Sequence, residues 1–341
     1  MKINALILGA GYFSQRIHIN TLNKNKKIKK IFLFDERKKL QDLVAKKFNL
    51  ECLNSFNLQE IKEKKIKLVV ISFVRELSFF YTQKAIKMNL HVLAEKPVVS
   101  KKENLIKIIN ESKKRKKVFQ ICYQKKFSPA IIFLKKNIQK MEKNYGSIKT
   151  VIFELFNGDM RNGTRSFCRT KEKIKHGSRS QKDLIKLKNH FNLINYKIFI
   201  NRYIHSINLF SNIFKIKNYK VGKLNILSKY NYSFLIKKKI NEFYFFFGDY
   251  NFNKWHDKIT IFFEKAKLTL SLNAPLNFED PKILIYDGNL KKNKNIKFKK
   301  DNIFANQLNF FLSSIYNKEY NNFLKEYKDD YNICKKLWKI K

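Results

Sequence analysis

The chain has 341 residues, of which 44% are hydrophobic, so it is long enough for two domains with real cores and is not a disordered protein. No apolar run approaches the roughly 20 residues that cross a bilayer, and the apolar N-terminal stretch breaks at Gly9, which indicates a buried strand instead of a signal peptide. The four cysteines are scattered without metal-ligand spacing, which predicts reduced thiols, no metal and a cytoplasmic protein with no membrane partner.

The formal net charge of +46 is the most extreme number in the composition. A balance this basic ordinarily indicates a nucleic-acid partner or an anionic surface. However, lysine, asparagine, isoleucine, phenylalanine and tyrosine are all abundant, and their codons are rich in A and T, so a biased genome explains the pattern. The lysines are also spread along the chain. We therefore expect no nucleic-acid partner, but a positive surface that attracts anionic substrates such as phosphorylated or nucleotide-linked sugars.

A glycine turn follows the first predicted strand, Ile3 to Leu8. The run Gly9-Ala10-Gly11 leads into Tyr12-Phe13-Ser14, where a helix begins. In a strand–turn–helix unit, glycines let the backbone approach a pyrophosphate at the helix N-terminus. The residues expected to bind a dinucleotide here are Gly9, Gly11, Tyr12 and Phe13. The alternative is a plain tight turn.

The second predicted strand, Ile31 to Phe34, ends at Asp35. An acidic residue at this point is expected to accept a hydrogen bond from the ribose 2′-hydroxyl and to repel a 2′-phosphate. The sequence therefore predicts NAD as the cofactor, and Arg37 close behind leaves NADP open.

A later apolar strand ends at Glu95-Lys96-Pro97. It delivers Lys96 to the carboxyl end of a strand, where open α/β sheets bind their ligands. Pro97 has no backbone N–H and stops the strand. Ser100-Lys101-Lys102-Glu103 then matches a capping box that opens a helix. Together with a last strand, Val118 to Tyr123, these alternating elements predict a doubly wound parallel sheet of the Rossmann type over residues 1–123.

The remaining residues, 124–341, are predicted to form an α+β domain with an open, mostly antiparallel sheet. Hairpin-like connections join the predicted strands, at 148–156, 221–228, 242–247, 259–263, 268–272 and 283–286. Residues 157–190 lack clear periodicity and are expected to form a long loop near the site. Two helices are expected to close the chain.

With Gly9-Ala10-Gly11, Glu95-Lys96-Pro97 and Tyr123-Gln124-Lys125-Lys126-Phe127-Ser128-Pro129 in this order, the chain resembles the Gfo/Idh/MocA oxidoreductase family. The similarity covers nearly the whole chain and is strongest over residues 1–156. It implies a nicotinamide cofactor, a sugar, cyclitol or nucleotide-sugar substrate, and a homo-oligomer formed through the C-terminal sheet. It also implies that Glu95 lies at the cofactor and that Lys96 contacts both the cofactor and the substrate hydroxyl.

The family's second signature usually reads Asp-x-Gly-x-His, often with a further Asp, and its best match here is Asn201-Arg202-Tyr203-Ile204-His205. The histidine is retained, but the acidic positions are Asn201 and Asn208. Asn201 and His205 are four apart on one predicted helix and are expected to face the same cleft. His205 would then be the acid or base, Lys96 would polarise the substrate oxygen, and Asn201 would only orient, because an amide cannot take a proton. A packed or solvated histidine is the alternative.

Two further departures from the family pattern bear on function. Ser78 stands where many members carry a histidine, and Phe73-Val74 replaces the usual Thr-Pro pair. The leading hypothesis is an NAD(H)-dependent dehydrogenase or reductase that acts on a CH–OH group of a sugar, cyclitol or nucleotide sugar. The alternative is a cofactor-binding sensor or assembly protein with little turnover.

Overall fold

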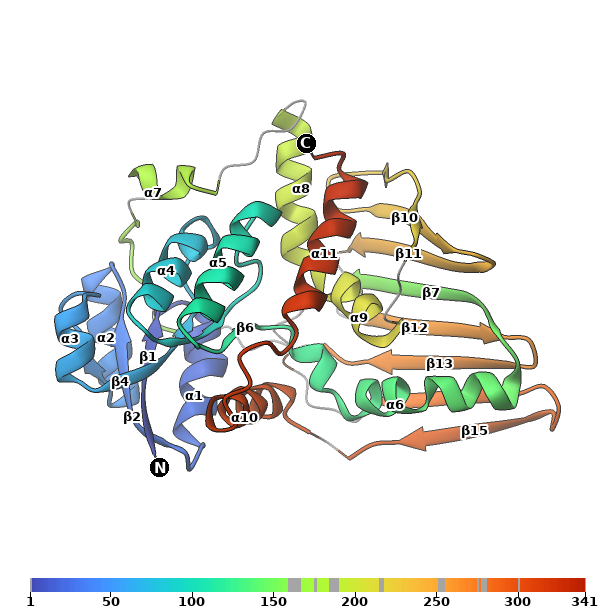
Figure 1. Cartoon of the computed structure of the whole chain (residues 1–341), viewed down its shortest axis with the longest axis horizontal. Helices are drawn as coiled ribbons and strands as arrows, with labels where there is room; N and C mark the ends of the chain where they lie inside the picture. Colours follow the sequence, from blue (N-terminus) through green and yellow to red (C-terminus); the bar gives the residue numbers. More distant parts are fainter. Residues whose placement is uncertain are drawn as a thin grey trace. The chain divides into compact units, whose positions relative to one another are not determined.

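The computed structural model describes residues 2–158, 167–174, 177–183, 190–214, 218–250, 255–274, 276, 281–299 and 301–340. The chain divides into two compact units (Figure 1). The first comprises residues 1–123, 166–185 and 304–328, and the second comprises residues 124–165, 186–303 and 329–341. Two later segments of the chain therefore belong with the N-terminal unit, although the sequence predicts them within a second domain spanning 124–341.

The first unit is built on a six-stranded parallel sheet with the strand order β3-β2-β1-β4-β5-β6. This is the Rossmann order, and it confirms the predicted doubly wound fold. Its strands are β1 (Ile3–Leu8), β2 (Ile28–Phe34), β3 (Glu51–Cys52), β4 (Ile66–Ile71), β5 (His91–Ala94) and β6 (Phe119–Ile121). Its helices are η1 (Ser14–His18), α1 (Ile19–Asn23), α2 (Lys38–Phe48), α3 (Leu58–Glu63), α4 (Arg75–Lys87), α5 (Lys102–Lys114), α7 (Gly177–Gln181) and α10 (Ile303–Tyr316).

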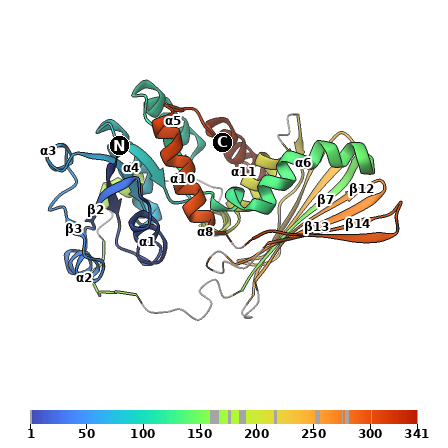
Figure 2. The same ribbon diagram turned by 90° about the horizontal axis from the view of Figure 1, so that it is seen from below.

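The central strands of this sheet are apolar almost throughout because helices cover both faces. Ile7 of β1, Val70 of β4 and Leu93 of β5 are buried in one core cluster. The same cluster includes Leu308 and Phe311 from α10, a helix close to the end of the chain. Figures 1 and 2 show α10 beside α1. The N-terminal sheet thus uses a C-terminal helix to complete its core.

Helix α5 begins one residue later than the predicted capping box requires. Its N-cap is Lys101, and that side chain makes no capping bond, so Ser100 is not the cap and this part of the prediction is wrong. The carboxylate of Asp183 instead accepts hydrogen bonds from the backbone N–H groups of Ser100 and Lys101. It also accepts one from Asn104 Nδ2 at 2.8 Å. A residue about 80 positions away in the chain therefore satisfies the start of α5.

The second unit contains a nine-stranded sheet with the main order β15-β14-β13-β12-β7-β11-β10-β8, and β9 pairs with β10. Among the described strands of this second sheet, only the β7–β11 pair is parallel. This confirms the predicted, mostly antiparallel sheet. Its strands are β7 (Ile148–Asn157), β8 (Lys220–Val221), β9 (Asn225–Ile226), β10 (Tyr232–Lys238), β11 (Asn241–Asp249), β12 (His256–Phe263), β13 (Ala266–Leu272), β14 (Lys282–Asp287) and β15 (Lys292–Lys297). Its helices include η2 (Gln124–Phe127), α6 (Pro129–Tyr145), α8 (His190–Arg202) and α9 (Ile204–Phe214), and α11 (Leu324–Leu337) ends in this unit.

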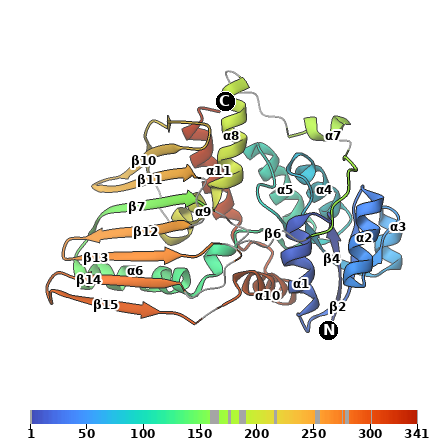
Figure 3. The same cartoon turned by 180° about the vertical axis from the view of Figure 1, so that it is seen from behind.

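Aromatic side chains build the core between this sheet and its helices. Phe245 of β11 stacks on Phe153 of β7 at 4.8 Å and on Phe234 of β10 at 4.4 Å between ring centroids. Phe210 of α9 meets Phe245 edge to face at 5.6 Å, so α9 covers this face. Viewed from behind, the opposite face carries no helix of the described chain (Figure 3). The sheet is therefore open on one side, as the sequence predicts.

Of the predicted loop over 157–190, residues 159–166, 175–176 and 184–189 lie outside the described residues. The remainder holds the end of β7, the short helix α7 and an irregular stretch. Because residues 166–185 belong to the first unit, this stretch becomes part of the surroundings of the Rossmann sheet.

His91 at the start of β5 makes the first unit sensitive to acid. Its Nδ1 accepts a hydrogen bond from the backbone N–H of Val118 at 3.0 Å. Burial, aided by the charges of Lys117 and Lys67, lowers the pKa of His91 to about 4. An unfolded histidine titrates near about 6.5. The unfolded chain therefore takes up a proton first, so this stability is present above about pH 6.5 and is lost toward about pH 4.

The variant His91→Gln keeps an acceptor for the Val118 N–H, because its amide oxygen accepts the same bond, but it does not titrate. When the pH is lowered from about 7.5 to about 5, we expect the urea midpoint of the wild-type protein to fall more than that of His91→Gln. Chemical denaturation followed by circular dichroism measures both midpoints. Equal losses in the two proteins would contradict the role given to His91.

Candidate functional site

The glycine turn after β1 has one glycine that the fold itself requires. Gly9 has φ +103°, and a Cβ there would lie 2.5 Å from the carbonyl oxygen of Ser72, the residue after β4. Its N–H donates to the carbonyl of Phe34 at 2.8 Å. Only glycine fits a left-handed residue so close to another backbone. Gly9 therefore places the turn tightly against the ends of β2 and β4.

Gly11 differs, because the fold does not require it. A Cβ built on Gly11 meets no atom of the described chain within 4 Å apart from its neighbours, and its φ is not positive. The residue thus borders open space at the point where a helix begins. A pyrophosphate needs this arrangement, since backbone N–H groups and the positive end of the helix dipole face it and a side chain would keep it away. The turn therefore fits the diphosphate of a dinucleotide.

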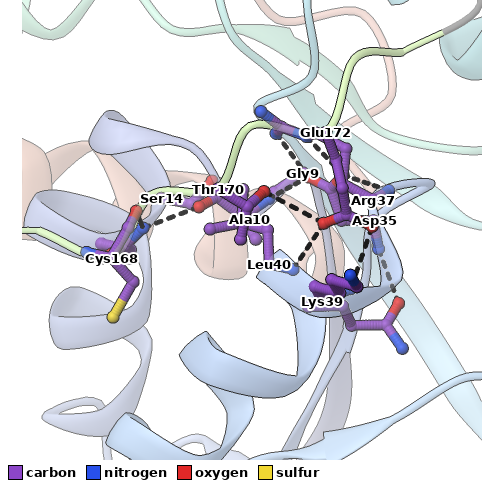
Figure 4. A network of polar contacts seen from close by, with 12 residues as sticks. Gly9, Ala10, Ser14, Asp35, Arg37, Lys39, Leu40, Cys168, Thr170 and Glu172 are labelled. Atoms are coloured by element: carbon purple, nitrogen blue, oxygen red, sulfur yellow. Dashed lines mark hydrogen bonds and ion pairs between the residues drawn. The ribbon is translucent and has the colours of Figure 1, made fainter.

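Ser14 and Asp35 fix the turn from its two sides. Ser14 is buried, and its hydroxyl donates to the carbonyl of Gly9. Asp35 follows β2, and its side chain is fully buried. Oδ2 of Asp35 accepts the backbone N–H of Ala10 at 2.7 Å. The carboxylate thus ties the glycine turn to the end of the neighbouring strand (Figure 4).

Arg37 binds the same carboxylate from the other side. Its backbone N and Nε donate to Oδ1 of Asp35 at 2.9 Å each, and Nη2 donates to Oδ2 at 2.8 Å. This hydrogen bonding raises the pKa of Arg37. With Ala10, the described residues supply four N–H donors to Asp35, which matches the roughly four lone-pair positions of a carboxylate. In this geometry Asp35 orders the turn, and a ribose hydroxyl reaches it only if Arg37 gives up a bond.

A second segment, far along the chain, crosses the same region. We call the described residues Phe167–Ile174 and Gly177–Asp183 the strap. Gln15 and Cys168 are joined by two hydrogen bonds. The backbone N–H of Cys168 donates to Oε1 of Gln15 at 2.8 Å, and Nε2 of Gln15 donates to the carbonyl of Cys168 at 3.0 Å. The ring of Phe167 meets Tyr12 edge to face at 5.0 Å between centroids. The strap therefore begins beside the glycine turn.

The strap continues past the ends of the other strands. Glu172 accepts the backbone N–H groups of Lys39 at 3.2 Å and Leu40 at 3.0 Å, at the start of α2 (Figure 4). Arg179 in α7 pairs with Glu36. Tyr81 of α4 also bonds Glu36, and burial, with that bond, raises the pKa of Tyr81. The sequence analysis missed these contacts, because their partners lie far apart in the chain and the strap has no periodicity.

Glu95 and Lys96 follow β5 at the carboxyl edge of the sheet, as the sequence predicts for a ligand-binding edge. Glu95 extends the β-ladder through its N–H to the carbonyl of Ile71 at 2.8 Å. Its carboxylate pairs with Nε2 of His18 at 2.8 Å, with both side chains largely buried. Lys96 is half-buried, and the peptide bond to Pro97 is cis. His18, to which the sequence analysis gives no role, thus holds the residue before Lys96.

Cys122 completes a small cluster around Glu95. Burial, the charge of Glu95 and a hydrogen bond to it raise the pKa of the Cys122 thiol well above its usual value. Among the described residues, potential ligand atoms of His18, Glu95 and Cys122 lie within 4.8 Å of one another. Because Glu95 bonds both partners, the three side chains satisfy one another as a hydrogen-bonded chain. The absence of a metal stays a prediction.

The structure corrects the expectation that Asn201 and His205 lie on one continuous helix. Helix α8 ends at Arg202 and α9 begins at Ile204, so Tyr203 stands at a break between them. Asn201 is exposed, whereas His205 is buried. The break coincides with the packing of Tyr203, which is buried. Its ring stacks on Phe247 at 4.7 Å between centroids, and its hydroxyl donates to the carbonyl of Tyr230 at 2.6 Å. Their spacing of four therefore does not put the two side chains on one helix face.

A buried carboxylate from α11 contacts α9, the helix that carries His205. Asn208 Nδ2 donates to Oδ2 of Asp330 at 2.7 Å, and both residues are buried. Asn208 is three residues after His205 on α9, so the two side chains lie on neighbouring parts of one face. The sequence analysis missed Asp330, which comes from α11 and carries no local motif. Asp330 thus contacts Asn208, the residue that stands where the resemblance leads us to expect an acid.

Substituting the two glycines separates the requirement of the fold from that of the ligand. We expect Gly9→Ala to lower the thermal midpoint strongly, because its Cβ would collide with the backbone of Ser72. We expect Gly11→Ala to keep the wild-type midpoint but to weaken NADH binding about tenfold or more, since a Cβ takes the space of the pyrophosphate. Calorimetry gives the midpoints and fluorescence titration the affinities. Unchanged NADH affinity in folded Gly11→Ala would contradict the placement of the dinucleotide.

Solved structures with the same fold include a ketoreductase and two dehydrogenases. KijD10, a 3-ketoreductase from Actinomadura kijaniata crystallised with NADP and TDP-benzene, has a TM-score of 0.75 at 11% identity, covering 97% of this chain and 95% of that chain. The UDP-N-acetylglucosamine 3-dehydrogenase GnnA from Acidithiobacillus ferrooxidans gives 0.71 at 14%, covering 99% and 97%. A dehydrogenase (MviM) from Clostridium difficile gives 0.72 at 13%, covering 99% of each chain. At these identities the likeness shows the fold alone.

A comparison of the sequence with protein families agrees with the geometry of the first unit. A search of curated proteins found no match to the sequence. Residues 3–123 match the family model described as an oxidoreductase family with an NAD-binding Rossmann fold. The match spans the glycine turn, Asp35 and the Glu95-Lys96-Pro97 turn. It confirms the resemblance stated from the sequence over these residues: residues 3–123 carry the NAD-binding Rossmann domain of the Gfo/Idh/MocA oxidoreductase family.

Proposed function

We propose that the protein is an NAD(H)-dependent oxidoreductase that transfers a hydride between nicotinamide and a carbinol or ketone of a sugar, cyclitol or nucleotide sugar. The observation that carries the proposal is the pairing of two features on one sheet edge. Gly11 leaves space for a pyrophosphate after β1, and Lys96 follows β5 at the same carboxyl edge. The TDP-benzene crystallised with KijD10 and the UDP-N-acetylglucosamine in the name of GnnA support the nucleotide-sugar class.

The residues proposed to hold the cofactor are Gly9, Gly11, Tyr12, Phe13, Asp35, Glu95 and Lys96. NAD(H), when bound, supplies the hydride acceptor or donor. The N–H groups at the start of the first helix would face the diphosphate, as at other helix N-termini. His18 would keep Glu95 in place beside Lys96 through their 2.8 Å pair. NAD is the proposed form of the cofactor, with NADP as the alternative that the structure of KijD10 contains.

Lys96 and His205 are the proposed catalytic residues. The ammonium of Lys96 would stabilise the negative charge that develops on the substrate oxygen during oxidation, or polarise the carbonyl during reduction. His205 would take or give the hydroxyl proton, since imidazole changes charge near neutral pH. Asn201 can only hydrogen-bond, and its exposed place at the end of α8 limits it to orienting a substrate group.

Asp330 is proposed to assist His205 through Asn208. The buried carboxylate would keep Asn208 in one orientation on α9, three residues after His205. The bond between Asn208 and Asp330 at 2.7 Å supports this role. The acidic group that the family usually carries within its second signature would then come from α11 instead.

The protein is also proposed to form a homo-oligomer through the open face of the large sheet. Phe246, Leu284 and Tyr286 point to that face and are 40%, 44% and 45% exposed. Exposed aromatic and aliphatic side chains on the open face of a sheet are typical of an interface.

No helix within the described ranges is long and apolar enough to cross a membrane.

Replacing these side chains tests the interface. We expect Phe246→Lys combined with Tyr286→Lys to reduce the assembly to monomers, because two charges would be buried at the contact. Analytical ultracentrifugation measures the mass of the wild-type and variant proteins. A wild-type monomer, or a double variant that keeps the wild-type mass, would contradict the proposed interface.

Alanine variants of the two proposed catalytic residues test the reaction. We expect Lys96→Ala and His205→Ala each to lower kcat by about 10²–10⁴-fold on the sugar nucleotide that the wild type turns over. NADH should still bind to His205→Ala with wild-type affinity, as measured by fluorescence titration. Lys114→Ala, an exposed lysine near the end of α5, is the matched control and should keep full activity.

Two results would overturn this account. Full activity of the His205→Ala protein would remove His205 from the mechanism. Wild-type protein that binds NADH but turns over no sugar, cyclitol or nucleotide sugar in a broad screen would favour the alternative, a cofactor-binding sensor or assembly protein.

A further inference from the structure

The strap contacts segments that follow three strands of the first unit's sheet at its carboxyl edge. Cys168 bonds Gln15 in η1 after β1, Glu172 and Arg179 bond residues after β2, and Asp183 bonds the start of α5 after β5. This is the edge at which open α/β sheets bind their ligands. A dinucleotide bound at the glycine turn therefore lies against the strap, and the strap's charges belong to its site.

The start of α2 would attract an anion if the strap were absent. Its N-cap is Arg37, its first residues are Lys38 and Lys39, and its first turn contains no acidic residue of its own. A helix N-terminus with unpaired N–H groups and lysines in its first turn is a typical phosphate site. A ribose at the end of β2 would lie close to this place, because the strand-end residue Asp35 is only three residues before the start of α2. A 2′-phosphate would thus find a positive site here.

Glu172 fills this place. Its two carboxylate oxygens accept the N–H groups of Lys39 and Leu40, and the hydroxyl of Thr170 donates to Oε2 at 3.0 Å. Desolvation opposes its charge, but these bonds outweigh that effect and lower the pKa of Glu172 below its usual value. The carboxylate is therefore ionised at neutral pH. The chain supplies its own anion where a 2′-phosphate would otherwise bind.

Asp35 is poorly placed to reject a 2′-phosphate by itself. Its carboxylate is fully buried and is neutralised by the bidentate contact with Arg37. The other nearby acid, Glu36, is paired with Arg179. Of the acids near the end of β2, Glu172 is held by neutral backbone and hydroxyl donors, whereas Asp35 and Glu36 are each paired with an arginine.

We infer that Glu172 is a specificity-determining residue for the cofactor: it occupies the anion site at the start of α2 and so excludes the 2′-phosphate of NADP(H). The inference rests on the proposed dinucleotide-dependent function. The preference for NAD(H) then comes from a residue 137 positions after Asp35 in the sequence (172 − 35), and not from the strand-end acid alone.

Binding of NADH and NADPH to the full-length chain tests this inference. We expect the wild type to bind NADH more tightly than NADPH. Glu172→Gln should tighten NADPH roughly tenfold, which corresponds to about 1.4 kcal/mol, with little change for NADH. Glu172→Asp retains the charge and should keep the wild-type ratio. Glu111→Gln removes one acid at the far end of α5 and serves as the control.

The outcomes separate the inference from the proposed function. A wild-type protein that binds neither dinucleotide overturns the proposed function. NADH binding with the same NADPH-to-NADH ratio in the wild type and in Glu172→Gln overturns only the role of Glu172, and so does a wild type that prefers NADPH. A role of Glu172 in capping α2 alone would lower the thermal midpoint of Glu172→Gln without moving the ratio.

Discussion

The site depends most on one buried carboxylate, Asp35. It accepts the N–H of Ala10 at 2.7 Å and is held by Arg37 through three further bonds. These contacts connect the end of β2, the glycine turn after β1 and the start of α2. Because a buried ionised group must be fully hydrogen-bonded, the three pieces of backbone are fixed together. The open space at Gly11 and the anion site taken by Glu172 both have defined positions as a consequence.

The chemistry is arranged around a second buried group, Glu95. His18 and Cys122 both bond to it, and it directly precedes Lys96. Glu95 is anchored by η1 and by the residue after β6, so two other segments of the first unit hold the turn that presents Lys96. Sequence spacing gives no hint of this, because His18 and Glu95 are 77 residues apart.

The parts of the fold that local chemistry determines were predictable from the sequence. Gly9 and the apolar strand before it form a turn whose backbone geometry only glycine permits, and Gly11 two residues later keeps the start of the helix clear. The alternation of buried strands with helices likewise identified the Rossmann sheet. The break at Tyr203 was not predictable, since the apolar pattern continues through it and only packing on Phe247 decides where Tyr203 lies. The strap was hidden for the same reason, because Glu172 and Asp183 act through partners about 80 to 130 residues away.

The central claim is that a dinucleotide binds at the glycine turn and presents its nicotinamide to Lys96. The most direct measurement is a crystal structure of the full-length protein with NADH and a nucleotide sugar. The account predicts the diphosphate over Gly11, the nicotinamide beside Lys96, and a substrate hydroxyl or carbonyl oxygen within hydrogen-bond distance of the Lys96 ammonium. A dinucleotide bound elsewhere, or a substrate whose oxygen is remote from Lys96, would contradict it.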